Sequence, residues 1–412
     1  MGATKTTADA ALKEDYQPLV REQINQDIPL LTYVEKNTKD TDGRRAVLSL
    51  HVTRNSGIGS RAEGGTLPTA GNQGYQEERV SLKYHYGRGQ LTGPLMRAAD
   101  SDKGSFERAM QAETRRIVDD LKRDINRQVW GTSDGVIAPA DQSSVSTRVY
   151  LASTASDVMV RQLEVGMLVD IGTVASPTLR TSANAIIGVS DLTASGGQSS
   201  IVLTTAVLTT TSQTDYIFRS GNGGSSGSQK EVTGLQTIVA ASGSLFNVDP
   251  ASYPVWASTV DSNSGTNRSI SENLMARVVQ NTQIKGGTYP NLAITHHGVF
   301  RAYANLLTSL KRFTNTVQLK GGYASGLPFS AGGGGDIPVV VDRDAPANQM
   351  FFIDTTHLTE FMASDWEFMQ EDGAVLSRVS GVDAYEFILF KGMEVGTDRR
   401  NVHGKLTDIA HA

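Results

Sequence analysis

Histidine pairs are the residues of this chain whose types and spacing come closest to a metal site. His296 and His297 are adjacent, and adjacent residues on a strand point to opposite faces, so these two cannot readily share an ion. His51 and His85 could face each other across a hairpin, but two ligands alone make a poor zinc site. The chain has no cysteine and no H-x-x-x-H or H-E-x-x-H motif. The sequence therefore predicts neither a metal ion nor another cofactor.

Two Gly-x-Ser-x-Gly strings raise the question of a serine nucleophile. They centre on Ser133 and Ser225. A nucleophile elbow needs a strand before the serine and a helix after it. Residues 131–135 instead follow a predicted helix, and residues 223–227 lie in a stretch rich in glycine and serine. We interpret both strings as chance matches that assemble no nucleophile, base and orienting group.

Glycine-rich loops and an acidic pair complete the candidates for chemistry. Gly57-x-Gly59-x-x-Ala62 follows a predicted strand, as a dinucleotide fingerprint would, but further glycines and Pro68 leave no helix to receive a pyrophosphate. The run 332–335 lacks the Lys-Ser or Lys-Thr of a P-loop. Asp365 and Glu367 flank a tryptophan and are typical of a turn or a solvated face. The sequence therefore predicts that the protein is not an enzyme.

A long hairpin over residues 44–91 is the most informative element. Polar and apolar residues alternate over Arg45–Thr53 and again over Arg79–Gly87, and a period of two predicts strands. About 25 glycine-rich residues separate them, and a loop of that length is uncommon in a compact domain unless it functions elsewhere. We expect an extended arm that neighbouring molecules stabilise, with a disordered surface loop as the alternative. The returning strand should place one apolar set on a single face: Val80, Leu82, Tyr84 and Tyr86.

A long amphipathic helix is predicted over Ser105–Trp130. Its apolar residues recur at steps of four and seven, and at ~1.5 Å per residue it would span roughly 40 Å. Gly131 should end it in a left-handed conformation. The apolar stripe consists of Phe106, Met110, Ile117, Leu121 and Ile125.

The remaining segments differ in composition. Residues 148–219 are rich in Thr, Ser and Val, with short apolar runs between turns, and predict a small β barrel or sandwich. Residues 220–229 have the composition of a flexible linker. Residues 230–412 predict mixed α and β structure. Their expected helices are Ser269–Ile284, opened by a capping box of Ser269 and Glu272, and Gly298–Phe313; their expected strands are 291–295, 337–341, 350–354, 358–362, 374–379 and 385–391.

Composition limits the class of protein. The chain has 412 residues, 39% of them hydrophobic, and a formal net charge of −5. A negative charge argues against a protein that coats nucleic acid, which is normally basic. No stretch reaches the ~18 apolar residues that a membrane helix needs, and the polar first residues lack the apolar region of a signal peptide. We therefore expect a protein made in a cytoplasm, without membrane segments.

The order of these elements resembles the major capsid protein of tailed double-stranded DNA phages, which has the Hong Kong 97-like fold. The resemblance covers most of the chain: an N-terminal arm, a glycine-tipped hairpin, a long helix and a late mixed α/β region. The sequence itself resembles the family most in the stretch from Gly43-Arg44-Arg45 to Gly93-Pro94, with residues 57–65 at the tip of the hairpin. The implied fold class is α+β, with an N-arm, an extended β-hairpin loop, a spine helix, peripheral and axial domains, and an inserted small β barrel or sandwich.

The resemblance also implies a division of the chain and two departures from some relatives. Some relatives carry a long scaffolding segment before the arm, whereas about 43 residues precede the hairpin in this sequence, so we expect any scaffolding protein to be separate. No lysine lies between Lys39 and Lys83, so the cross-link that some relatives form through a loop lysine is not carried over. The implied parts are the N-terminal arm (1–43), the extended loop (44–91), the peripheral domain with its spine helix (92–147), the inserted β domain (148–219), the linker (220–229), mainly the axial domain (230–350) and the return strands of the peripheral domain (351–412).

The function that the resemblance implies is assembly. Copies of the chain would form hexamers and pentamers and then an icosahedral shell around phage double-stranded DNA, without sequence-specific DNA binding. The portal would be a further partner, and scaffolding and decoration proteins are candidates. The protein would assemble in the host cytoplasm and reside in the virion capsid. The alternatives are a nanocompartment shell, a phage tail or adhesion component, and a hydrolase with an unrecognised site.

Three charged residues at the hairpin tip are the expected intersubunit contacts: Arg54, Arg61 and Glu63. They stand in a glycine-rich segment with no packed core beside them to supply a partner. Plain solvation of these side chains is the alternative.

Overall fold

The computed structural model describes most of the chain. Residues 1–28 of the predicted N-terminal arm, 224–228 of the predicted linker and 332–334 of the glycine run lie outside the described residues. The described ranges are 29–39, 41, 43–94, 103–141, 145–174, 179–191, 197–207, 215–223, 229–310, 327–330, 335–370 and 375–411.

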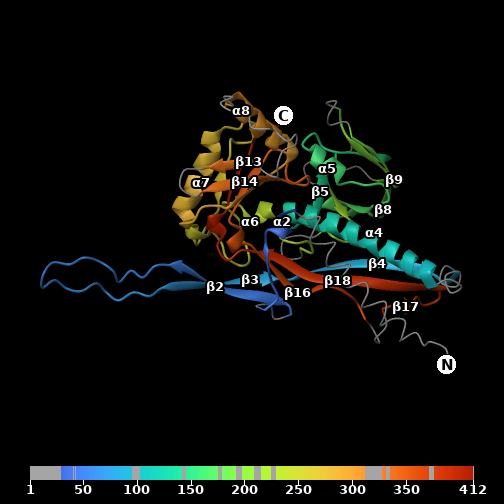
Figure 1. Cartoon of the computed structure of the whole chain (residues 1–412), viewed down its shortest axis with the longest axis horizontal. Helices are drawn as coiled ribbons and strands as arrows, with labels where there is room; N and C mark the ends of the chain where they lie inside the picture. Colours follow the sequence, from blue (N-terminus) through green and yellow to red (C-terminus); the bar gives the residue numbers. More distant parts are fainter. Residues whose placement is uncertain are drawn as a thin grey trace, which may run out of the picture.

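A five-stranded sheet, here called the lower sheet, runs along the long axis of the molecule (Figure 1). β18 is its central strand and pairs antiparallel with β4, β16 and β17. β1 follows the short helix α2 (Pro29–Thr32) and adds parallel to β16, a pairing that the sequence did not predict. The strands are β1 (Glu35–Asn37), β4 (Lys83–Thr92), β16 (Thr359–Phe368), β17 (Ser377–Arg378) and β18 (Ala384–Gly396).

The predicted spine helix is confirmed as α4 (Lys103–Trp130), which packs against the lower sheet at two glycines of β4. A Cβ at Gly87 would lie 2.6 Å from Leu121 Cδ1, and a Cβ at Gly89 would lie 2.7 Å from Ile117 Cδ1. Real Cβ atoms do not approach so closely. Both glycines therefore permit the close packing of helix and sheet.

The end of α4 differs from the prediction. The N–H of Gly131 donates to Gln128 O at 2.9 Å, which tightens the last turn, and Gly131 does not have a positive φ. The left-handed conformation falls instead on Ser133, at φ 68°, and Gly135, at φ 80°. A Cβ at Gly135 would also crowd Asn222 O at 3.0 Å, so the turn needs this glycine for space as well as for φ.

The hairpin consists of β2 (Arg45–Thr53) and β3 (Gly74–Ser81) and projects beyond the body (Figure 1). Its first strand matches the prediction. The prediction of one returning strand over Arg79–Gly87 is wrong, because β3 ends before Leu82 and β4 begins after it. β3 pairs with β2, whereas β4 pairs with β18.

This change of partner inverts the alternation of side chains. Val80 and Leu82 are buried, but Tyr84 and Tyr86 are 46% and 55% exposed. The alternate residues of β4, His85 and Gly87, are on the opposite, buried face, where Gly87 contacts α4. The four residues that were predicted to share one face therefore lie on two: Val80 and Leu82 on a buried face, and Tyr84 and Tyr86 on an exposed face.

The inserted β unit is a six-stranded sheet in the order β5-β10-β7-β8-β9-β6, with an apolar core of its own. A bridge between Ala140 and Leu151 joins the two end strands, so the sheet closes into a small barrel. β5 and the start of β6 precede residue 148, where the sequence placed the boundary. The elements are β5 (Val136–Pro139), β6 (Ser146–Tyr150), α5 (Asp157–Arg161), β7 (Leu168–Thr173), β8 (Leu179–Ser190), β9 (Ser200–Val207) and β10 (Asp215–Arg219).

A second six-stranded sheet, in the order β11-β19-β15-β12-β14-β13, carries the helices α7 and α8 (Figure 1). The last strand of the chain, β19, lies in this sheet and not beside β16 and β18. The elements are α6 (Leu235–Ile238), β11 (Thr259–Asp261), α7 (Glu272–Gly286), β12 (Leu292–Thr295), α8 (His297–Leu310), β13 (Leu327–Ser330), β14 (Asp336–Val341), β15 (Met350–Ile353) and β19 (Gly404–Leu406).

The predicted capping box of α7 is wrong. Ser271, not Ser269, is the N-cap, and its side chain accepts a hydrogen bond from the N–H of Leu274 at 3.3 Å. Glu272 is therefore the first residue of the helix and cannot reach back as a capping-box glutamate. Gly287 ends the helix with φ 79°.

Adding a side chain at Gly89 should separate α4 from the lower sheet. Gly89→Val places methyl groups against Phe387 and Ile117, and overpacking of this kind costs about 1–3 kcal/mol. Gln90→Val adds the same side chain to the exposed face of β4 and serves as the control. Denaturant unfolding of dispersed subunits should show the loss for Gly89→Val alone; equal stabilities would mean that the helix can move aside freely.

Candidate assembly interface

The hairpin tip, residues 54–73, exposes apolar side chains. No regular strand is formed there, because β2 ends at Thr53 and β3 begins at Gly74. Ile58 is 78% exposed and Leu67 is 81% exposed. Both side chains stand on an arm that projects from the body (Figure 1), so their apolar surface is available to another molecule.

The three predicted contact residues lie on this tip and are exposed. Arg61 is braced locally, because its guanidinium donates to Thr66 O at 3.0 Å and to Ser60 O at 2.9 Å. Its side chain therefore organises the tip before any partner arrives. The structure brings Arg54 and Glu63 to the same exposed segment.

The glycine pattern that imitates a dinucleotide fingerprint has a different role. The two sides of the tip approach closely, and a Cβ at Gly71 would lie 2.6 Å from Asn55 Oδ1 and 3.0 Å from Gly57 N. Asn55 Oδ1 also accepts a hydrogen bond from the N–H of Gly57 at 2.6 Å. Glycine is needed here for the narrow approach of two backbones, not for a phosphate.

A second exposed apolar surface lies on the lower sheet. The rings of Tyr84 and Tyr86 on β4 lie 5.8 Å and 5.3 Å from the ring of Phe390 on β18. Arg88 and Glu386 form an ion pair further along the same two strands. We call Tyr84, Tyr86 and Phe390 the aromatic face. The sequence prediction missed it because it placed both tyrosines on the same face as Val80 and Leu82, which are buried.

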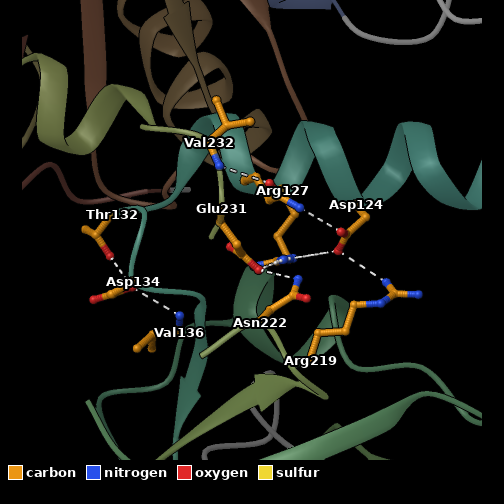
Figure 2. A network of polar contacts seen from close by, with 10 residues as sticks. Asp124, Arg127, Thr132, Asp134, Val136, Arg219, Asn222, Glu231 and Val232 are labelled. Atoms are coloured by element: carbon orange, nitrogen blue, oxygen red, sulfur yellow. Dashed lines mark hydrogen bonds and ion pairs between the residues drawn. The ribbon is translucent and has the colours of Figure 1, made fainter. Parts of the chain in front are cut away.

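Buried charges join the spine helix to the segment that follows the barrel (Figure 2). Arg127 donates to Glu231 at 3.0 Å and to Asp124 at 3.2 Å, and its side chain is only 7% exposed. Burial raises the pKa of Asp124, but the charges of Arg127 and Arg219 outweigh burial and hold that pKa below its ordinary value. For Arg127, burial opposes the charge, but Glu231 and Asp124 outweigh it and raise the pKa.

The same network reaches the exit of the barrel. Arg219, the last residue of β10, pairs with Asp124 at 3.2 Å, and Asn222 donates to Glu231 at 2.9 Å (Figure 2). Gln128 adds a contact by accepting from the N–H of Val232 at 3.1 Å. Both sides of the predicted linker are thus fixed to α4, so the barrel is held at its base.

The structure places His51 and His85 in different surroundings. His51 lies opposite Tyr75 in the hairpin and contacts Gln73 at 2.6 Å, whereas His85 is buried on β4 opposite Lys391. Burial lowers the pKa of His85 to about 4. Over the residues that the structure describes, no group of three or more His, Cys, Asp or Glu could hold a metal ion.

The two candidate serines and the acidic pair lie in different parts of the chain. Ser133 is buried in the turn after α4, and Ser225 lies outside the described residues. Asp365 and Glu367 lie on strand β16, not in a turn, and Asp365 accepts from the N–H of Trp366 at 2.9 Å. Among the described helices, none is long and apolar enough to cross a membrane.

Comparison with known proteins gives one family and a set of similar structures. A model of the SU10 major capsid protein family matches residues 204–409. No curated protein matches the chain. The family match begins inside the barrel, in β9, and extends to the residues just after β19.

The chain is similar to several solved structures, among them phage and particle capsids and an encapsulin. The capsid asymmetric unit of cyanophage A-1(L) aligns with 13% identity and a TM-score of 0.59, over 93% of each chain. A capsid of a native GTA particle aligns with 10% identity and a TM-score of 0.47, over 92% of this chain and 90% of that one. The holo-SrpI encapsulin of Synechococcus elongatus PCC 7942 aligns with 8% identity and a TM-score of 0.44, over 92% of this chain and 86% of that one. At 13% identity, the cyanophage likeness is one of fold.

Neutralising Asp124 should loosen the joint between α4 and the barrel. Asp124→Asn leaves Arg219 and one side of Arg127 without a counter-charge. Breaking a fully buried pair costs about 3–5 kcal/mol, and the loss here should be smaller because Arg127 keeps Glu231 and Arg219 is 39% exposed. Asp120→Asn, on the exposed face one turn earlier, is the matched control. Chemical unfolding of dispersed subunits is the measurement. Two variants of equal stability would show that the charge of Asp124 does not stabilise this joint.

Proposed function

The chain belongs to the SU10 major capsid protein family, and from this premise we propose that its extended hairpin is the arm by which one subunit holds a neighbour in the icosahedral shell. The protein is a structural capsid subunit of the virion, not an enzyme. The Hong Kong 97-like α+β fold predicted from the sequence is confirmed by the cyanophage likeness.

One observation carries the proposed role of the hairpin. Ile58 and Leu67 are about four-fifths exposed on a tip that packs against no core of its own subunit. Burial of apolar surface is worth roughly 25 cal/mol per Å², so covering both side chains with a neighbour is favourable. Contacts that join different surfaces of identical subunits generate rings, and many such contacts acting together make the product stable.

The charged residues of the tip would supply specificity to the same contact. Arg54, Arg61 and Glu63 carry both signs of charge within ten residues, which suits a neighbour that also presents both signs. The bracing of Arg61 by Thr66 O and Ser60 O supports this role, because a preorganised side chain loses less entropy on binding.

We propose domain roles that keep the predicted division, except that β15 and β19, which fall almost entirely in the predicted peripheral return strands 351–412, belong to the sheet assigned to the axial domain. The lower sheet and α4 would form the peripheral domain, and the sheet that carries α7 and α8 would form most of the axial domain. The barrel, with its separate apolar core, would be the inserted domain. Residues 1–43 would form the N-terminal arm; β1, near the end of that segment, pairs with β16 and would be its root.

The proposed DNA content rests on the net charge of the chain, and the proposed protein partners rest on the resemblance to phage capsid proteins. A net charge of −5 suits a container whose wall should not bind packed double-stranded DNA tightly. The portal and separate scaffolding and decoration proteins would complete the particle, which would assemble in the host cytoplasm. Membership of a capsid family disfavours the nanocompartment, tail-component and hydrolase alternatives.

Charge on the apolar tip should block assembly without affecting the fold. Ile58→Asp and Leu67→Asp would bury a carboxylate against the neighbour, whereas Ile58→Leu keeps the apolar surface and is the control. Arg61→Ala and Glu63→Ala should weaken assembly to a smaller degree, because exposed pairs contribute only about 0.2–1 kcal/mol each. Negative-stain microscopy and sedimentation would report shells against free subunits.

Thermal unfolding of the dispersed subunits controls for the fold. All five variants should melt with the original protein, because the tip packs against no core. If both aspartate variants form shells at the same protein concentration as Ile58→Leu, the tip makes no apolar intersubunit contact.

A further inference from the structure

Glu78 is a buried carboxyl group at the base of the hairpin. It lies on β3 opposite Leu48 of β2, its exposed fraction is 0%, and neither of its carboxyl oxygens has a hydrogen-bond partner among the described residues. Buried polar groups are almost always hydrogen-bonded, so an isolated carboxyl group needs an explanation. An apolar side chain at this position would pack without that cost.

The strand that carries Glu78 is docked on the body at this point. The N–H of Arg79 donates to Phe246 O at 3.0 Å, and the hydroxyl of Tyr253 donates to Gln76 at 3.3 Å. On the other side, Gly396 leaves space for Val80, since a Cβ there would lie 3.2 Å from the valine. These contacts are made just before the hairpin leaves the body, so Glu78 is buried only while the base of the hairpin stays docked.

The charges around Glu78 disfavour its ionised form. Burial is the main cause and Asp398, in the turn after β18, is the second; together they raise the pKa of Glu78 from 4.5 to about 9. Asp398 itself pairs with His357 at 3.0 Å. The nearest charges on β3, Glu77 and Arg79, are exposed and pair with each other at 2.9 Å. The facing position on β2 is apolar.

We propose that Glu78 is a proton-controlled latch for the hairpin: the neutral acid keeps the base of the hairpin docked on the body, and ionisation favours a state in which the base lifts and the carboxylate becomes hydrated. The latch operates within one subunit. Its use in assembly rests on the proposed role of the hairpin as the intersubunit arm, because a lifted base would let the arm change its angle to reach a neighbour.

The direction of the pH dependence follows from linkage. An acid whose pKa is raised in the docked state stabilises docking fully below pH 4.5, and this stabilisation is lost as the pH rises towards 9. Between these limits the lifted population should grow about tenfold for each pH unit. Neutral pH lies inside this window, so small pH changes act on the latch.

Hydrogen exchange at the Arg79 amide tests the latch directly, because its bond to Phe246 O exists only when the base is docked. In dispersed subunits, the protection factor at this amide should fall about 100-fold between pH 6 and pH 8, after correction for the intrinsic exchange rate. Glu78→Gln should abolish this dependence, and Glu77→Gln, on the exposed face of the same strand, should keep it. If Glu78→Gln does not fold, Glu78→Leu serves in its place.

Three results would overturn the latch. They are a protection factor at Arg79 that does not change with pH, the same dependence in the Glu78 variant, and an equal loss at the Ile294 amide in the central strand β12, which would indicate global unfolding. Because the experiment uses free subunits, its failure would leave the proposed intersubunit role of the hairpin tip standing. Conversely, the latch could work as proposed while the tip variants still assemble into shells. That pair of results would refute only the intersubunit role of the tip.

Discussion

The ladder between β4 and β18 is the interaction on which the rest of the structure depends. It runs without interruption from Lys83 opposite Met393 to Thr92 opposite Ala384. One end of β4 continues from the projecting hairpin, and its buried face receives α4 at Gly87 and Gly89. The same ladder therefore anchors the arm and positions the spine helix, and it leaves Tyr84 and Tyr86 on the outside. A subunit pulled by its arm would transmit that force into this sheet.

Buried charges connect this sheet and helix to the rest of the body. Lys391 and Glu360 pair at 2.7 Å on neighbouring strands, with side chains 2% and 1% exposed. Arg127 and Asp124 fix the barrel to α4, and Arg400 donates to main-chain carbonyls that include Ile238 O at 2.8 Å, at the end of α6. Buried pairs add little net stability, but breaking one is costly, so they fix geometry. Glu78 stands apart from these groups because, within the described part of the chain, its carboxyl oxygens have no such partner.

The sequence predicted those helices and strands whose signal, such as hydrophobic periodicity, is contained in their own residues. The spine helix, the first hairpin strand and the helices α7 and α8 were predicted to within a few residues, because periodicity defines them. The change of partner at Leu82 was missed for two reasons. Polar and apolar residues keep alternating across the end of β3 and the start of β4, and no glycine or proline marks the boundary between the two strands. The new partner, β18, is about 300 residues away, and only tertiary structure selects it. The barrel began earlier than predicted for the same reason: β5 pairs with β10, across the whole barrel sequence.

The site was predictable in outline but not in its chemistry. A glycine-rich tip with isolated charges indicated an arm. Ile58 and Leu67 were not predicted as contact residues, because two apolar residues in a loop have no periodicity. The single most direct test of the arm uses the absence of cysteine from the chain. Ile58→Cys gives one thiol, whose reaction with a maleimide can be timed in free subunits and in shells. We expect the reaction in shells to be about tenfold slower or more, because a covered thiol reacts only in rare open states; equal rates would contradict the role of the hairpin as an intersubunit arm.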